Sequence, residues 1–139
     1  MTLTRDSRIA SERGQTAVEF ALVAPVLVAV LLTVIQFALA FHDYVTLTDA
    51  ARAGARKAIV ARFANDPTQA IADAGQAVRD SAAQLKQSDL GVDVSDPSWT
   101  TSGSVVTVTA TYPYTIDIPL LGMTIASGSL TAIAKERLE

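Results

Sequence analysis

The sequence predicts an α+β protein in which a long N-terminal helix spans a membrane and carries a small extracytoplasmic domain. Three observations support this prediction. An uncharged run of 22 residues lies near the N-terminus, a segment of helical period follows a proline in mid-chain, and alternating, strand-like segments fill the last third. We expect the second, amphipathic helix to pack on a small antiparallel β-sheet of three or four strands.

Composition excludes several function classes. The chain has 139 residues, a formal net charge of -3 and no cysteine, which argues against nucleic-acid binding and excludes disulfides and thiolate chemistry. There is one histidine, and no G-x-S-x-G or phosphate-binding glycine loop occurs. We therefore expect no catalytic residues, no cofactor and no metal site.

The first element is the apolar run Phe20–Phe41. As a helix it would measure about 33 Å, enough to cross a hydrocarbon core of roughly 30 Å. Its one strongly polar residue is Gln36, and Pro25 should bend it. The only helix breaker between Pro25 and Pro67 is Gly54, so the helix should continue as a stalk to about residue 63.

Three interpretations of this run remain open. It could be a secretory signal cleaved after Ala40, although signal cores of 7–15 residues are shorter. It could be a permanent single-pass anchor. Alternatively, Gly14 could mark a processing point, which makes Gln15 the mature N-terminus and Glu19 the fifth mature residue. In the last two cases, three arginines before the run place the N-terminus in the cytoplasm and the C-terminal domain outside.

The segment RGQTAVEFALVAPVL, residues 13–27, resembles the N-terminus of TadE-like minor pilins (pseudopilins) of the tight-adherence, or Flp, branch of the type IV pilus family. Gly14, Glu19 and Phe20 carry the resemblance, and TLTDAARAGARKA, residues 46–58, extends it. Major Flp pilins usually have Glu-Tyr and are much shorter. The Glu-Phe pair and the large C-terminal domain therefore favour a minor pilin.

This resemblance implies a structural, pilin-like protein in the cell membrane. A prepilin peptidase would cleave between Gly14 and Gln15, dividing the chain into a leader (1–14), a transmembrane and stalk helix (15–64) and an extracytoplasmic α+β domain (65–139). Implied partners are other pilin subunits, the peptidase, a secretion ATPase with its inner-membrane platform, and membrane lipid, but no nucleic acid. The alternative is a membrane-anchored binding or scaffold domain that is not cleaved at Gly14.

Two roles are open for Glu19. The resemblance implies that it meets the positive N-terminal amine of a neighbouring subunit during assembly, together with the adjacent Phe20. Opposite unit charges 4 Å apart attract by about 4 kcal/mol at an effective dielectric of 20. Residues 16–19 also form a capping box, with Thr16 as N-cap and Glu19 at the third helical position.

The stalk contains a possible helix-packing face. Ala50, Gly54 and Ala58 recur at intervals of four residues, a spacing of small side chains that lets another helix approach closely. Alanine is also simply a good helix former. Gly54 supports the contact interpretation, because glycine costs about 1 kcal/mol inside a helix.

The C-terminal part should begin with a helix, because Asp66 and Pro67 are strong start signals. We expect Gly91 to close this helix. Alternating residues predict strands at 104–112, 114–118 and 123–136, with a short one at 92–94. Pro113 and Pro119 should confine 114–118 to an edge or a short strand.

The loop between the helix and the strands contains Asp89, Asp93 and Asp96, but their spacing fits no standard calcium loop. We expect ordinary turn chemistry there. Trp99 should fill part of the core.

Overall fold

The structure is a computed structural model that describes residues 4–61, 66–95, 103–118 and 122–137, with side chains from residue 14 onward. Its elements are α1 (Thr4–Ala61), α2 (Pro67–Ser81), β1 (Gly91–Ser95), β2 (Val105–Ile118) and β3 (Met123–Arg137). The two helices and the antiparallel sheet β1-β2-β3 confirm the predicted α+β class. Trp99 and Asp96 lie outside the described residues.

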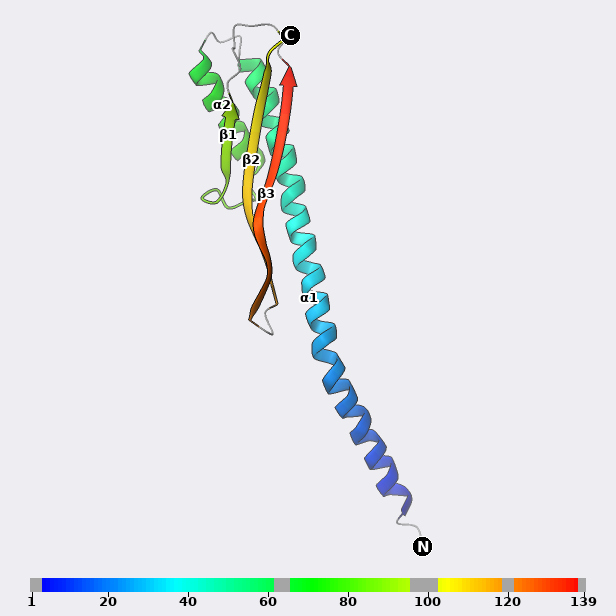
Figure 1. Cartoon of the computed structure of the whole chain (residues 1–139). Helices are drawn as coiled ribbons and strands as arrows, with labels where there is room; N and C mark the ends of the chain where they lie inside the picture. Colours follow the sequence, from blue (N-terminus) through cyan, green and yellow to red (C-terminus); the bar gives the residue numbers. More distant parts are fainter. Residues whose placement is uncertain (1–3, 62–65, 96–102, 119–121, 138–139) are drawn as a thin grey trace.

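Helix α1 runs the whole length of the molecule, with the sheet and α2 gathered around its C-terminal half (Figure 1). Its 58 residues correspond to about 87 Å. The helix passes through Pro25 without interruption and begins at Thr4. The prediction that Thr16 is the N-cap was therefore wrong. Residues 4–15 contain no proline, and the helix extends through them to Thr4.

The sheet consists of a long hairpin, β2–β3, with β1 added along part of one edge. β1 pairs with residues 107–111 of β2, whereas β2 and β3 pair over almost their full lengths. The tip of this hairpin points toward the N-terminal half of α1 (Figure 1). Gly122, beside the tip, has φ +60, a left-handed conformation that favours glycine.

Pro113 does not end a strand. The expected short segment 114–118 is the second half of β2, which continues through the proline and stays paired with β3. This is possible because β1 stops pairing at Thr111, so beyond that point one edge of β2 is free. A proline lacks the N–H donor and is tolerated at such an edge.

Helix α2 packs chiefly on α1 and touches the sheet mainly at β1, which corrects the expected packing of α2 on the sheet. α1 itself covers β2 and β3. The contact is close at Gly54: a Cβ there would overlap Val78 Cγ2 and lie 3.1 Å from the carbonyl oxygen of Ala74. The small residues of α1 thus let α2 approach closely. The sheet is covered mainly by α1, the longer helix.

Helix α2 starts as expected and ends earlier than expected. The Asp66 side chain accepts hydrogen bonds from the backbone N–H groups of Thr68 and Gln69, as an N-cap does. The helix ends at Ser81, and the Gln87 side-chain amide donates to the Ala82 carbonyl oxygen at 2.9 Å. Gly91 is the first residue of β1, so the prediction that it closes the helix was wrong.

The core is thin and rich in alanine. Among the buried apolar side chains, the largest fully buried ones are Leu47, Val78, Val106 and Val108. Most of the others are alanines from α1 and α2. Small side chains bury little apolar surface, so we expect this domain to depend on close contacts between backbones.

Candidate functional site

The motif from Gly14 to Phe20 lies on an exposed part of α1. Gly14 is helical, and a Cβ added to it would meet nothing within 4 Å. The side-chain amide of the adjacent residue Gln15 donates a hydrogen bond of 3.1 Å to Oε1 of Glu19, one turn further along the helix. Phe20 beside it is exposed. The motif is therefore accessible from outside, and no other element of the described chain covers it.

Glu19 has no charged partner within the described side chains, where no ion pair includes it. Its partner Gln15 is neutral. In lipid, an unpaired carboxylate is costly, and acidic side chains in membrane spans usually find partners. The geometry thus leaves the Glu19 carboxylate available for a positive group supplied from elsewhere.

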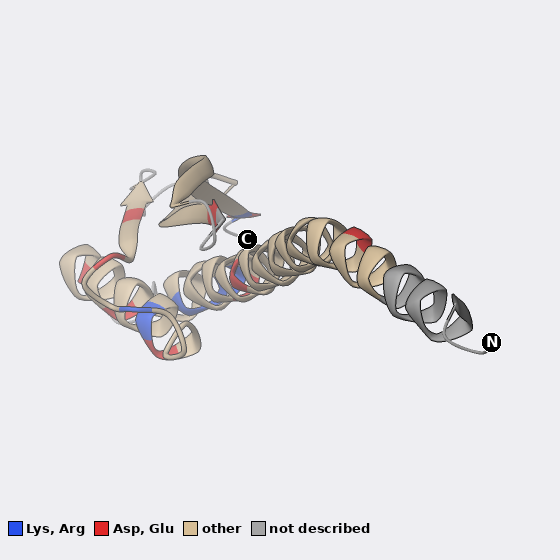
Figure 2. Cartoon of the chain, turned by 90° about the horizontal axis from the view of Figure 1, so that it is seen from below, with Lys and Arg blue, Asp and Glu red and all other residues tan. Residues whose placement is uncertain are grey.

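Beyond this motif, α1 presents apolar side chains on all sides. The uncharged stretch appears as the long tan part of α1 between charged residues in Figure 2. Among the described residues, α1 from Gly14 to Ala61 is long and apolar enough to cross a membrane, and none of its most apolar stretch is buried. Pro25 is exposed on this surface. An exposed apolar helix of this length fits a single-pass membrane anchor.

Ala50, Gly54 and Ala58 lie at the other end of α1, where all three are buried. Gly54 faces Ala74 and Val78 of α2. Within this chain the small-residue face therefore contacts the second helix. It is covered by that helix, in contrast to the exposed motif at Gly14.

Gln36 connects the sheet to the apolar part of α1 by hydrogen bonds, a role that the sequence analysis did not predict. Its side-chain amide donates to the Asp117 carbonyl oxygen and accepts from the Asp117 N–H. These are the backbone groups on the free edge of β2. The Asp117 carboxylate accepts a hydrogen bond of 2.7 Å from Thr124. The signal in the sequence was the single amide within an otherwise apolar run.

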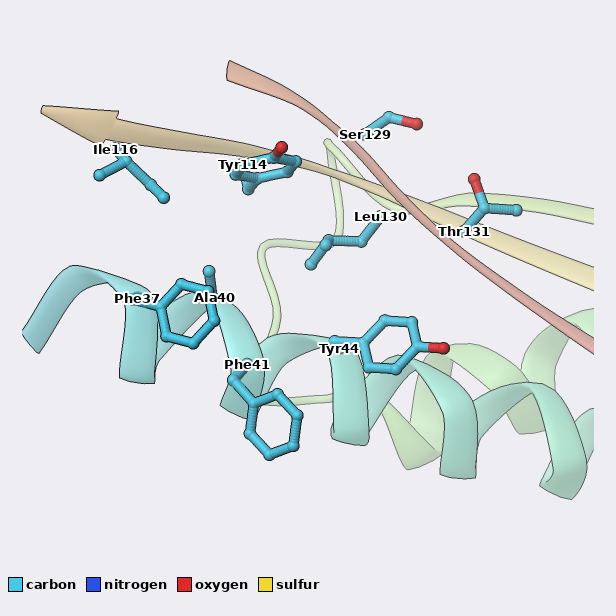
Figure 3. Close-up of a pocket in the computed structure, with 9 residues that line it drawn as sticks. All are labelled: Phe37, Ala40, Phe41, Tyr44, Tyr114, Ile116, Ser129, Leu130 and Thr131. Carbon is cyan, nitrogen blue, oxygen red and sulfur yellow. The ribbon is translucent and has the colours of Figure 1, made fainter. Parts of the chain in front are cut away.

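A groove of about 430 Å³ separates α1 from the hairpin just beyond Gln36 (Figure 3). Tyr114, Ile116 and Leu130 face it from the strands, opposite Phe37 and Ala40 on the helix. Apolar and aromatic side chains dominate its walls. The polar side chains on its walls are the hydroxyls of Tyr44, Tyr114, Ser129 and Thr131.

The acidic loop after α2 contains an ordinary ion pair. Asp89 Oδ2 lies 3.0 Å from Lys86 Nζ, and this contact lowers the pKa of Asp89, with Ser88 contributing a further hydrogen bond. The same hydrogen bond and charge raise the pKa of Lys86. Asp93 is exposed on β1. Within the described ranges, no cluster of acidic or histidine side chains could hold a metal ion.

Comparison with known proteins supports the interpretation of the N-terminal half. Residues 14–56 match the family model described as TadE-like protein. No match was found among curated proteins or among solved structures. The matched segment begins at the exposed glycine and ends within the stretch of α1 that packs on α2. Residues 14–56 are thus similar to the TadE-like family, which is consistent with a TadE-like protein of the tight-adherence pilus system.

Proposed function

We propose that this protein is a minor pilin (pseudopilin) that a prepilin peptidase cleaves after Gly14 and that joins a tight-adherence pilus through α1. The observation that carries the proposal is the bare apolar half of α1, which begins at the Gly14–Glu19 motif and lies outside the packed domain. A helix of this kind can be solvated by lipid before assembly and by neighbouring apolar helices afterwards.

Cleavage requires local unwinding, because Gly14 is helical in the uncleaved chain. Two features favour it. Glycine is less stable in a helix than alanine by about 1 kcal/mol, and no side chain packs against Gly14. The peptidase would therefore meet a helical segment that opens at low cost on the cytoplasmic side.

Cleavage would also supply a positive partner for Glu19. The new α-amine on Gln15 is positive at neutral pH. A neighbouring subunit could bring this amine to the exposed Glu19 carboxylate. Each charge is costly in lipid without a partner, so the pairing of the two would favour assembly. The secretion ATPase and its inner-membrane platform would then move the paired subunits outward.

The first test is the N-terminal sequence of the protein isolated from membranes. We expect Gln15 as the first residue. A start at Met1 or Thr2 would contradict the proposal and support the permanent anchor. A start at Phe41 would indicate a secreted protein.

The second test is Glu19→Ala, compared with Asp49→Ala as a matched control. Asp49 is an exposed acid on the same helix, and its partner is Arg52 at 3.4 Å. We expect both variants to be inserted and processed, but only Glu19→Ala to be absent from sheared surface filaments. Normal recovery of Glu19→Ala in filaments would show that Glu19 has no part in assembly.

A further inference from the structure

The tip of the β2–β3 hairpin carries large apolar side chains that nothing in the described chain covers. Met123 is 60% exposed and Ile125 53% exposed. Ile125 is the residue that interrupts the pairing register, because Ile116 pairs with Ala126 and Asp117 with Thr124. From Met123 to Ala134, β3 contains no charged residue, and neither do the connecting residues 119–121 in the sequence.

This tip lies beside the part of α1 that would be in the membrane. Gln36, which binds the backbone of Asp117, comes five residues before the end of the apolar run. By the helical rise, Asp117 is therefore level with a point about 8 Å inside that end. Met123 pairs with Ile118, one residue further toward the N-terminal half.

The bonds between Gln36 and Asp117 suit a non-aqueous environment. In water, the free edge of β2 could bond to solvent. In lipid, every backbone N–H and C=O needs a partner from the protein. Gln36 satisfies both groups of Asp117 from within the apolar run, and the Asp117 carboxylate is bonded to Thr124.

Aromatic side chains surround the same level. Phe37, Phe41 and Tyr44 are exposed on α1, and Tyr114 lies on β2 at the opposite wall of the groove (Figure 3). Tyrosine is enriched where membranes meet water. The apolar surface of α1 thus continues onto the hairpin tip, where the Asp117 carboxylate is hydrogen-bonded to Thr124.

We propose that the tip of the β2–β3 hairpin enters the outer face of the phospholipid bilayer and places Met123 and Ile125 in lipid. Together with α1, the tip forms a second membrane contact that sets the depth and rotation of the extracytoplasmic domain. This inference goes beyond the proposed function, because it needs neither cleavage at Gly14 nor a pilus.

The absence of cysteine from the chain allows a direct test with single-cysteine variants of the full-length protein. Ile125→Cys and Met123→Cys would carry an environment-sensitive fluorophore. Ile133→Cys is the matched control, since Ile133 is 60% exposed on the same strand but about 26 Å further from the tip. Each labelled protein is reconstituted in vesicles of phosphatidylethanolamine and phosphatidylglycerol.

We expect nitroxide-labelled lipids to quench the Ile125 and Met123 probes several-fold more strongly than the Ile133 probe. Aqueous iodide should show the opposite order. Equal iodide quenching at Ile125 and Ile133 would overturn the proposal by placing the tip in water. Protection from both quenchers at high protein-to-lipid ratio would also overturn it, because a second copy of the chain would then cover the tip.

Discussion

Gly54 offers a stringent test of how the two helices meet. A Cβ at this position would overlap Val78 Cγ2 and would lie 3.1 Å from the Ala74 carbonyl oxygen and 3.4 Å from Val108 Cγ1. Val78 and Val108 are fully buried, so neither can move outward easily. Gly54→Ala should therefore overpack the contact between α1, α2 and β2.

The expected magnitude follows from two opposing effects. Alanine gains about 1 kcal/mol over glycine in a helix interior. Overpacking a close-packed core typically costs about 1–3 kcal/mol. Because the overlap at Gly54 involves a branched, buried side chain as well as backbone, we expect the cost to dominate and the net destabilisation to be about 1 kcal/mol.

Gly75→Ala is the matched control, because Gly75 is also helical but a Cβ there would meet nothing within 4 Å. It should stabilise the domain by up to about 1 kcal/mol. Guanidinium unfolding in mild detergent, followed by tyrosine fluorescence, measures both changes relative to the parent protein. The two variants should differ by about 2 kcal/mol.

A double mutant locates the cause. Val78→Ala alone should destabilise the domain by creating a cavity. Combined with Gly54→Ala, it should cost less than the sum of the single changes, because the added methyl group then has space. If Gly54→Ala stabilised the protein as much as Gly75→Ala does, the close approach of α2 to Gly54 would be refuted.

Three further outcomes are expected. Gln36→Leu leaves the backbone of Asp117 without its side-chain partner, so the Asp117 amide should exchange faster with deuterium; an unchanged rate would contradict the bond. Asp66→Ala removes the cap of α2 and should lower the free energy of unfolding by about 1 kcal/mol in guanidinium titrations, whereas Asp66→Asn should restore most of it. The lowered pKa of Asp89 means that its contribution is complete above the ordinary value of 3.8 and is lost as the pH falls through the folded value. When the pH is lowered, the unfolding midpoint of Lys86→Met should therefore fall less than that of the parent protein. An unchanged pH profile would show that the ion pair does not contribute to stability.

Local signals were sufficient for the elements whose causes are local. The apolar run predicted the long helix, and Asp66 with Pro67 predicted the start of α2, because capping and helical period depend on neighbouring residues only. Tertiary contacts decided the remainder. The position of α2 depends on its close contact with Gly54, which forms only when both helices are present. The apolar residues of α2 at helical spacing do not show which surface they will meet.

The errors at Thr16 and Gly91, and the unexpected continuation of β2 through Pro113, have a similar origin. Each residue type is a common terminator, but its effect depends on what lies beside it. Pro113 is tolerated because β1 has already ended, and Gly91 begins a strand in which a Cβ would overlap the Thr111 hydroxyl. The exposed site at Gly14 and Glu19 was accessible to sequence reasoning because it lies within one short segment.

The direction of β3 has a practical consequence. This strand returns from the hairpin tip and ends at Arg137, so the C-terminus lies at the opposite extremity of the molecule from the N-terminus (Figure 1). An epitope tag fused there would project away from the apolar half of α1 and leave that half unobstructed. Under the proposed function, antibody labelling of intact cells could then follow display of the protein, and a tag fused to Met1 would be lost with residues 1–14.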